Sequence, residues 1–170
     1  MDNLTISIFG SKIFLEIINE IKLFSKFNIK FYEDFDLCVK DSQKSNLLAI
    51  FFVNKGNLSL FNNSELNNFP SLFITDISIP SDNFFSSEIY DHIKIPLSIH
   101  EVEKKIVSLS AKSEFKKNSV IKLNNYVINK IERKIKRNEL ELQLSEKEID
   151  FLIMFSKSKK PINKDLVLKK

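Results

Sequence analysis

Short apolar runs alternate with amphipathic stretches along the first two thirds of the chain. Leu4–Phe9 is apolar and rich in β-branched residues, and it is broken by Gly10 and Ser11. Apolar side chains then recur at helical spacing over Ile13–Phe24. The same alternation predicts further strands over Asn28–Tyr32, Leu47–Val53, Leu72–Thr75 and His92–Lys94, with helices over Phe35–Val39 and Ser98–Leu109.

This order of elements predicts an α/β fold. Strands that alternate with helices form a parallel sheet covered on both faces, and the continuous apolar run Leu47–Val53 is typical of its central strand. Five strands fit the flavodoxin-like order 2-1-3-4-5, in which the chemistry lies at the carboxyl ends of the strands. Those ends are Phe9–Ser11, Val53–Lys55, Thr75–Asp76 and Lys94–Pro96.

The last third of the chain has a different pattern. Ser110–Asn118 is polar and rich in lysine, and we expect a linker at 113–118. Four short strands follow, over Val120–Leu123, Tyr126–Ile131, Lys134–Lys136 and Glu139–Leu144, with turns at Asn124–Asn125 and Arg137–Asn138. The alternation of Leu140, Leu142 and Leu144 marks an amphipathic strand.

Ser145 and Glu148 form the sequence pattern of a capping box, which predicts a helix with Ile149, Leu152, Ile153 and Phe155 on its apolar side. Lys159–Ile162 should break this helix, and Asn163 should cap another that begins at Asp165. These boundaries give an N-terminal domain over 1–112 and a C-terminal domain over 119–170.

Charge separates the same two modules. Residues 1–112 carry 11 Lys/Arg and 14 Asp/Glu, a net −3, whereas residues 113–170 carry 15 and 8, a net +7. A basic module of this kind is suited to meet a polyanion. The total of 170 residues holds one cysteine and no apolar run long enough to cross a bilayer. We therefore expect a cytoplasmic protein without a disulfide framework.

The C-terminal module resembles the start of the OmpR/PhoB-type winged-helix domain. The resemblance rests on the block from Leu144 to Phe155, in which the capping box precedes the leucine spacing, and on Pro161–Leu168 after it. The N-terminal module resembles the receiver domain that usually precedes this winged helix. Thr75 stands where receivers place a threonine or serine, and Pro96 where they place a proline that is usually cis.

The resemblance breaks down at the residues that carry phosphotransfer chemistry. Receivers hold magnesium with an acidic pair after the first strand, but Gly10 and Ser11 occupy those positions. The expected phosphoacceptor aspartate is Asn54, whose amide cannot form an acyl phosphate. Lys94 lies one residue early for the Lys-Pro pair. We therefore expect a pseudo-receiver outside phosphorelay chemistry, with no enzyme activity, metal or cofactor, and with a reduced third helix.

Several residues carry two interpretations. Thr75 is either a switch residue or an ordinary strand end, and Asn54 either a neutral stand-in for the acceptor or a loop residue. Asp76 is a weak candidate for a lone metal ligand. Cys38 fits a small buried apolar side chain, and His92 and His100 fit structural or exposed positions. Lysines near the end of the capped helix fit DNA phosphate contacts or a solvated loop; they are Lys157, Lys159, Lys160 and Lys164.

The functional expectation is a transcription regulator that resembles those of two-component systems and binds double-stranded DNA. A homodimer through helix Ser98–Leu109, with Glu101, Glu103, Lys104 and Lys105 outside, and a contact with RNA polymerase are further expectations from the resemblance, and no membrane partner is expected. Lys170 falls inside the expected second helix, so the recognition helix and wing should be missing, either in a fragment or in a natural truncation. The alternative is a pseudo-receiver that binds a protein partner and does not bind DNA by itself.

Overall fold

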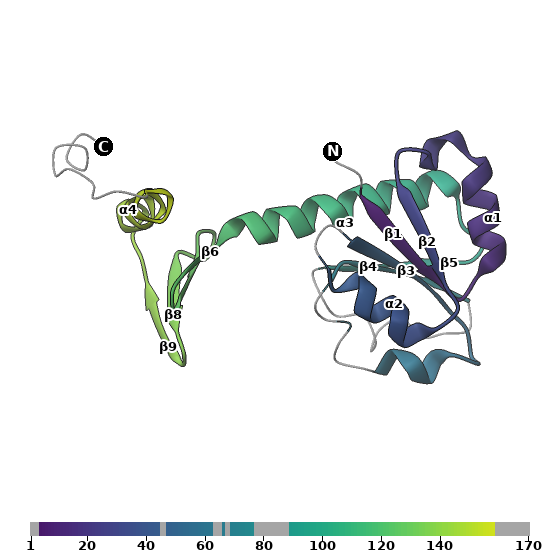
Figure 1. Ribbon diagram of the computed structural model, residues 1–170, viewed down its shortest axis with the longest axis horizontal. Helices are drawn as coiled ribbons and strands as arrows, with labels where there is room; N and C mark the ends of the chain where they lie inside the picture. Colours follow the sequence, from purple (N-terminus) through teal and green to yellow (C-terminus); the bar gives the residue numbers. More distant parts are fainter. Residues whose placement is uncertain (1–3, 45–46, 63–65, 67–68, 77–88, 159–170) are drawn as a thin grey trace. The chain divides into compact units, whose positions relative to one another are not determined.

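The computed structural model describes residues 4–44, 47–62, 66, 69–76 and 89–158. The chain divides into two compact units, Met1–Ser113 (unit 1) and Glu114–Lys170 (unit 2), each of which is described by itself (Figure 1). None of the described helices is long and apolar enough to cross a membrane.

Unit 1 contains a five-stranded parallel sheet in the order β2-β1-β3-β4-β5, as the sequence pattern predicts. Its strands are β1 (Thr5–Phe9), β2 (Asn28–Tyr32), β3 (Leu47–Val53), β4 (Ser71–Thr75) and β5 (Tyr90–Lys94). β3 lies at the centre, and all of its residues except Phe52 are buried. A strand flanked on both sides and covered on both faces has no room for polar side chains, which explains its unbroken apolar run.

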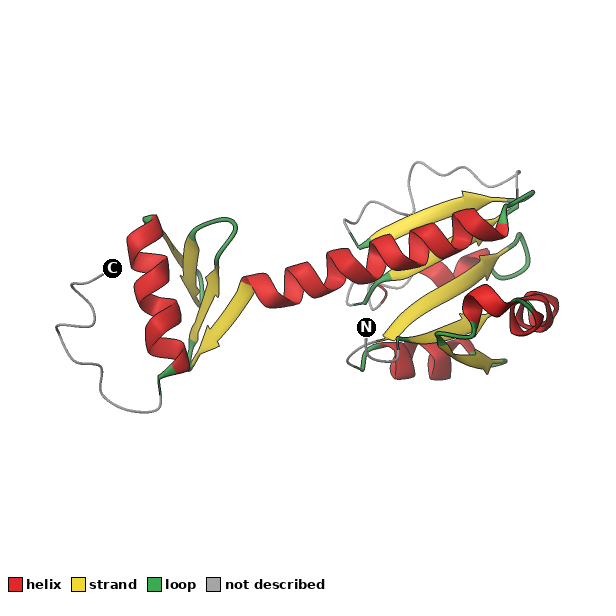
Figure 2. Cartoon of the chain, turned by 90° about the horizontal axis from the view of Figure 1, so that it is seen from above, coloured by secondary structure: helices red, strands yellow, loops and turns green. Residues whose placement is uncertain are grey.

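Helices cover both faces of this sheet (Figure 2). They are α1 (Lys12–Glu20), α2 (Phe35–Ser42), α3 (Ile99–Ser119) and the short 3-10 helices η1 (Lys22–Phe24) and η2 (Leu58–Asn62). α1 and α3 share one core cluster, to which they contribute Phe14, Ile18, Val102, Ile106 and Leu109. The opposite cluster is rich in phenylalanine, and its rings are Phe9, Phe35, Phe51, Phe61, Phe69 and Phe73. Between β3 and β4 the structure describes the short helix η2, and Leu66 is also in 3-10 conformation. The reduced third helix expected there falls partly on residues 63–65 and 67–68, which lie outside the described residues.

Helix α3 corrects one expectation. The pattern predicted a helix that ends at Leu109 and an irregular linker at 113–118, but the helix runs without a break to Ser119. Ile99–Ser119 contains no glycine or proline, and its lysines, glutamates and alanine favour a helix even where few apolar side chains pack against it. Polarity alone therefore does not mark a linker in this chain.

Unit 2 is a four-stranded antiparallel sheet in the order β6-β7-β8-β9, followed by one helix. Its elements are β6 (Val120–Leu123), β7 (Tyr126–Asn129), β8 (Lys134–Arg137), β9 (Leu140–Gln143) and α4 (Glu146–Lys157). β7 ends two residues earlier than predicted, because the Asn129 side-chain oxygen accepts hydrogen bonds from the backbone N–H groups of Ile131, at 3.0 Å, and Glu132, at 3.2 Å. Asn124 and Asn138 adopt positive φ in the two predicted turns.

The predicted capping box opens α4. The Ser145 hydroxyl oxygen accepts from the Glu148 backbone N–H at 3.4 Å, and the Glu148 carboxylate accepts from the Ser145 backbone N–H at 2.8 Å. These bonds satisfy N–H groups that the first turn of a helix leaves without a partner. The predicted break at Lys159–Ile162, the cap at Asn163 and the helix from Asp165 lie outside the described residues.

Candidate functional site

The strand ends of unit 1 place the expected site residues at one edge of the sheet. The register sets Val53 beside Thr75 and Thr75 beside Lys94. Asn54 follows β3 directly, and Gly10 follows β1, the neighbour of β3 on its other side. The parallel sheet thus brings Gly10, Asn54, Thr75 and Lys94 to its carboxyl edge, where the fold class predicts chemistry.

Gly10 stands where a receiver has an acidic side chain, and the structure leaves no space for a side chain there. Its φ is +94°, and a Cβ added there would lie 2.7 Å from the Phe52 carbonyl oxygen and 3.2 Å from the Phe52 Cβ. The adjacent Ser11 caps α1, because its hydroxyl oxygen accepts from the Phe14 backbone N–H at 3.2 Å. The Phe14 and Phe52 rings pack with centroids 4.8 Å apart. This corner therefore has neither a carboxylate nor space for one at residue 10.

The side chain of Asn54 is occupied by its own loop. Its Oδ1 accepts from the backbone N–H groups of Gly56, at 2.8 Å, and Asn57, at 3.1 Å. The Asn57 side chain returns the contact: its Oδ1 accepts from the Asn54 N–H at 2.8 Å, and its Nδ2 donates to the Phe52 carbonyl at 2.8 Å. These bonds close a turn after β3. They favour the loop-residue interpretation of Asn54 over the neutral stand-in for an acceptor.

The β4 and β5 ends retain more of the receiver pattern. Thr75 is 2% exposed, and its carbonyl accepts from the Ile95 backbone N–H at 3.0 Å. The Ile95–Pro96 peptide bond is cis, as the resemblance implied. Lys94 and Asp76 are both exposed. In the described part of the chain, no group of three or more His, Cys, Asp or Glu side chains is placed to hold a metal ion.

Cys38 offers no nucleophile. It is fully buried on α2, and burial raises the pKa of its thiol to about 12. Since the thiolate is the reactive form, a thiol with this pKa stays inert at neutral pH. His92 and His100 are exposed.

A charged cluster between β2 and α2 was not foreseen from the sequence. The Asp41 carboxylate accepts from Lys44 Nζ and from the Tyr32 hydroxyl, and Lys30 Nζ lies 3.5 Å away. The Lys44 and Tyr32 hydrogen bonds lower the pKa of Asp41 to about 2, and burial and the same carboxylate raise the pKa of Tyr32 to about 12. Such a cluster pins α2 to the edge strand β2. The residues of this cluster are separated in the sequence, so no local motif predicts the cluster.

Two of the four charges expected on the outer face of α3 are engaged within unit 1. Lys26 Nζ lies 2.5 Å from the Glu103 carboxylate, and Lys105 Nζ lies 2.5 Å from that of Asp91. Glu101 and Lys104 are exposed. Fewer charges are thus available to a second chain on this face than the sequence suggested.

The basic character of unit 2 is partly neutralised by its own carboxylates. Lys134 Nζ lies 2.5 Å from the Glu141 carboxylate, and an Arg133 nitrogen lies 3.7 Å from that of Glu146. Lys157, the last residue of α4, is exposed. The other predicted phosphate contacts lie outside the described residues; they are Lys159, Lys160 and Lys164.

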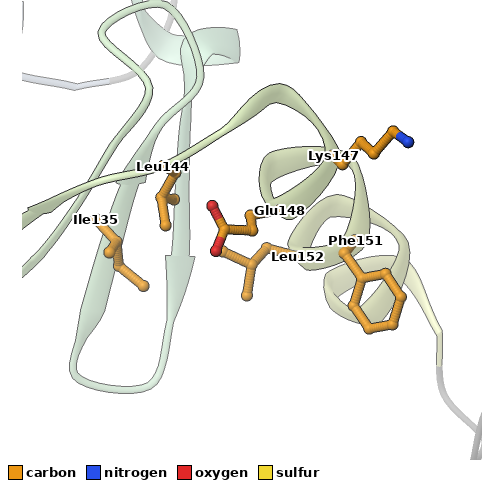
Figure 3. A pocket seen from close by; sticks show the side chains of 6 residues that line it. All are labelled: Ile135, Leu144, Lys147, Glu148, Phe151 and Leu152. Carbon is orange, nitrogen blue, oxygen red and sulfur yellow. The ribbon is translucent and has the colours of Figure 1, made fainter.

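A groove of about 460 Å³ lies between the sheet of unit 2 and α4. Figure 3 shows Ile135 and Leu144 from the strand side and Leu152 from the helix pointing toward the space between them, whereas Lys147 points away. Glu148 and Phe151 complete the lining. No sequence motif indicates this groove, although the alternation of Leu140, Leu142 and Leu144 predicts an apolar face on this strand.

Comparisons with known proteins place the fold. No family model matches the chain, and no curated protein matches its sequence. Among solved structures, a variant of RitR with one cysteine replaced by serine is 16% identical, with a TM-score of 0.53 over 98% of this chain and 80% of that one. A variant with aspartate there gives 16% and 0.49, over 97% and 78%. A structure described as "a novel family of redox sensors in the streptococci evolved from two-component response regulators" gives 17% and 0.45, over 97% and 79%.

The likeness to the serine variant of RitR agrees with the sheet order β2-β1-β3-β4-β5. The chain has a response-regulator-like fold.

Proposed function

We propose that this protein is a DNA-binding transcription regulator that acts without phosphorylation. Independence from phosphorylation is carried by one observation: the Phe52 carbonyl lies so close to Gly10 that no side chain fits at residue 10. DNA binding is proposed from unit 2 and its resemblance to the OmpR/PhoB-type winged helix.

Independence from phosphate follows from three positions at one sheet edge. Phosphotransfer to a receiver needs an aspartate and carboxylates that bind Mg²⁺. Asn54 has an amide in place of the acceptor, and its oxygen is hydrogen-bonded inside the loop. Gly10 and Ser11 supply no carboxylate, and positive φ with the Phe52 contact disfavours any replacement of Gly10. The regulator would then be controlled by its amount or by partners instead of by a kinase.

DNA binding is supported by charge and by the order of elements in unit 2. The last 58 residues carry a net +7, and the four-stranded sheet leads into a capped helix as in the family it resembles. Lysine contacts to phosphates give affinity without sequence preference. Lys157 is the described member of the predicted contact set, and a homodimer through α3 and a contact with RNA polymerase belong to the same proposal.

A second candidate is a pseudo-receiver module that binds a protein partner and not DNA by itself. It is favoured by the ion pairs that neutralise Arg133 and Lys134, and by the exposed apolar groove beside them. Redox sensing through a thiol is not favoured, because Cys38 is the sole cysteine and is fully buried.

Titration of the full chain with duplex DNA at two salt concentrations separates the two candidates. The regulator should bind with a Kd of ~10⁻⁴–10⁻⁶ M at physiological salt, and more tightly at low salt, because binding releases counterions from DNA. Lys157→Gln should weaken binding and reduce its salt dependence, while Lys40→Gln, an exposed lysine on α2 of unit 1, is the matched control. Absence of binding at low salt would favour the interaction module.

Incubation with acetyl phosphate and Mg²⁺, read by intact mass, tests independence from phosphate. We expect no adduct on the wild type. We also expect none on Asn54→Asp, because the carboxylates that hold Mg²⁺ are still missing at residues 10 and 11. A stable adduct on the wild type that is lost in Asn54→Ala would contradict the proposal.

A further inference from the structure

The positive charge of unit 2 is unevenly distributed along its sequence. Residues 114–130 carry four lysines and one glutamate, a net +3, whereas residues 131–158 carry six basic and six acidic residues, a net of zero. Residues 159–170 carry five lysines and one aspartate, a net +4. In the described part of unit 2, the net positive charge therefore comes from the end of α3 and from the β6–β7 hairpin, and not from β8, β9 or α4.

Four lysines supply this charge, and we call them the α3–β7 lysines: Lys116, Lys117, Lys122 and Lys130. The first three are exposed and Lys130 is half-buried. None of the four forms an ion pair with a carboxylate of the described residues, whereas Arg133 and Lys134 both do. The basic residues 159–170 cannot neutralise them, because Asp165 is the one carboxylate side chain in that segment.

The backbone holds the α3–β7 lysines in one region of unit 2. Lys116 and Lys117 lie in the last turn of α3, which leads directly into β6 (Figure 1). The Lys130 backbone N–H donates to the Ser119 carbonyl at 2.8 Å, which places Lys130 beside the end of that helix. Lys122 lies on β6 opposite Val127 of β7. Regular structure thus gathers four cations that repel one another.

Stabilisation of the helix end accounts for only a small part of this charge. The C-terminus of a helix carries roughly −0.5 of an elementary charge, and cations in its last turn stabilise it. Lys116 and Lys117, with Lys130 beside Ser119, already exceed what that partial charge can offset. Lys122 lies on a strand beyond the helix. Most of the positive charge is therefore left for a partner outside the chain.

We propose that the α3–β7 lysines contact the phosphate backbone of double-stranded DNA. This inference rests on the proposed DNA binding and adds a surface outside α4 and the lysines that follow it. Duplex DNA carries about one negative charge per 1.7 Å of its axis, so lysines spread over several residues can each meet a phosphate. Contacts of this kind position a protein on the duplex without reading its sequence.

The side chains favour phosphates over the carboxylates of an acidic protein. Arginine pairs with a carboxylate through two parallel hydrogen bonds, whereas lysine binds phosphate as a point charge. Both arginines of the chain lie outside the α3–β7 lysines and are engaged: Arg133 pairs with Glu146, and Arg137 Nη1 donates to the Tyr126 hydroxyl at 3.1 Å. The lysines therefore suit a polyanion that is bound through its charge density.

Titration of the full chain with a short labelled duplex, at several salt concentrations, tests this contact. Each lost phosphate contact should lower the slope of log affinity against log salt concentration by ~0.9. Lys122→Gln with Lys130→Gln should therefore lower the slope by about 2 and weaken binding about tenfold or more at physiological salt. Lys12→Gln with Lys40→Gln, at exposed lysines of unit 1, is the matched control, which removes the same charge and should keep the slope.

The outcomes separate this contact from the proposed function. A wild type that does not bind the duplex at low salt would overturn both. If the wild type binds and the Lys122 and Lys130 variant has the slope of the control, DNA binding stands and this contact is wrong. Weaker binding with an unchanged slope would also contradict the contact, because the loss of a phosphate contact lowers the slope.

Lysine acetylation of the wild-type chain tests the same contact without substitutions. With a limiting amount of an acetylating reagent, read by mass spectrometry of the peptides, the duplex should protect Lys122 and Lys130 and leave the exposed Lys40 unchanged. Equal acetylation with and without the duplex would overturn the proposal. Protection by polyglutamate and not by the duplex would also overturn it, and would indicate an acidic protein as the partner.

Discussion

Replacing Gly10 by alanine tests the closed corner at the carboxyl edge of the sheet. The added Cβ would meet the Phe52 carbonyl oxygen at 2.7 Å, and residue 10 would have to keep a φ of +94°. The carbonyl cannot turn away freely, because it accepts a hydrogen bond from Asn57 Nδ2 and belongs to the central strand β3. Both the backbone strain and the contact should destabilise unit 1.

The expected loss follows from two terms. A non-glycine residue held in a sparsely populated backbone region costs about 1–3 kcal/mol, and an overpacked contact in a rigid core costs about 1–3 kcal/mol more. Gly10→Ala should therefore lower the free energy of unfolding by about 2–6 kcal/mol. With a typical urea dependence of about 1–3 kcal/mol per molar, the unfolding midpoint should fall by about 1 M or more.

Urea unfolding followed by far-ultraviolet circular dichroism measures the loss. Gly56→Ala is the matched control, since its added Cβ would meet Asn54 Oδ1, a side-chain atom, at 3.2 Å. This variant should stay within about 1 kcal/mol of the wild type, because alanine also reduces the freedom of the unfolded chain. If the unfolding midpoint of Gly10→Ala equalled that of the wild type, residue 10 would have space for a side chain, and an acidic residue could be accommodated there.

Three further measurements check other parts of the structure. Ser145→Ala should cost unit 2 about 0.5–2 kcal/mol by removing the N-cap of α4; an unchanged unfolding midpoint of unit 2 would contradict the capping box. The pKa of Asp41 is lowered from 3.8 to about 2, so its contribution to the free energy of unfolding should be complete above pH 3.8 and lost as the pH falls through 2. Asp41→Asn should remove this contribution, which is about 1–2 kcal/mol, and with it this part of the acid dependence. Cys38 should not react with a thiol reagent in the native chain and should react on unfolding; rapid native labelling would show that α2 opens.

The sequence alone predicted most of the elements and their order. β2, β3 and β6 have the predicted bounds, because each is a continuous or alternating apolar run closed by polar residues. The alternation of strands and helices predicted a parallel sheet, since parallel neighbours need a crossover between them, and the flavodoxin-like order that fits five such strands is the observed one. The capping box of α4 could be predicted from the sequence because both of its residues lie within a stretch of four. The expectation that Asn54 takes the place of a phosphoacceptor needed only the residue that follows one predicted strand.

Tertiary structure decided what depends on distant parts of the chain. The contact between Gly10 and Phe52 joins the residue that follows β1 to a residue of β3, and no local pattern shows that a carbonyl oxygen occupies the space of the missing Cβ. The same is true of Asp41, whose partners Tyr32 and Lys30 lie on β2. The end of α3 at Ser119 was missed because polar sequence is compatible with both linker and helix. Leu142 reads as a core residue in its strand pattern, and only the packed unit shows that nothing within the described chain covers it.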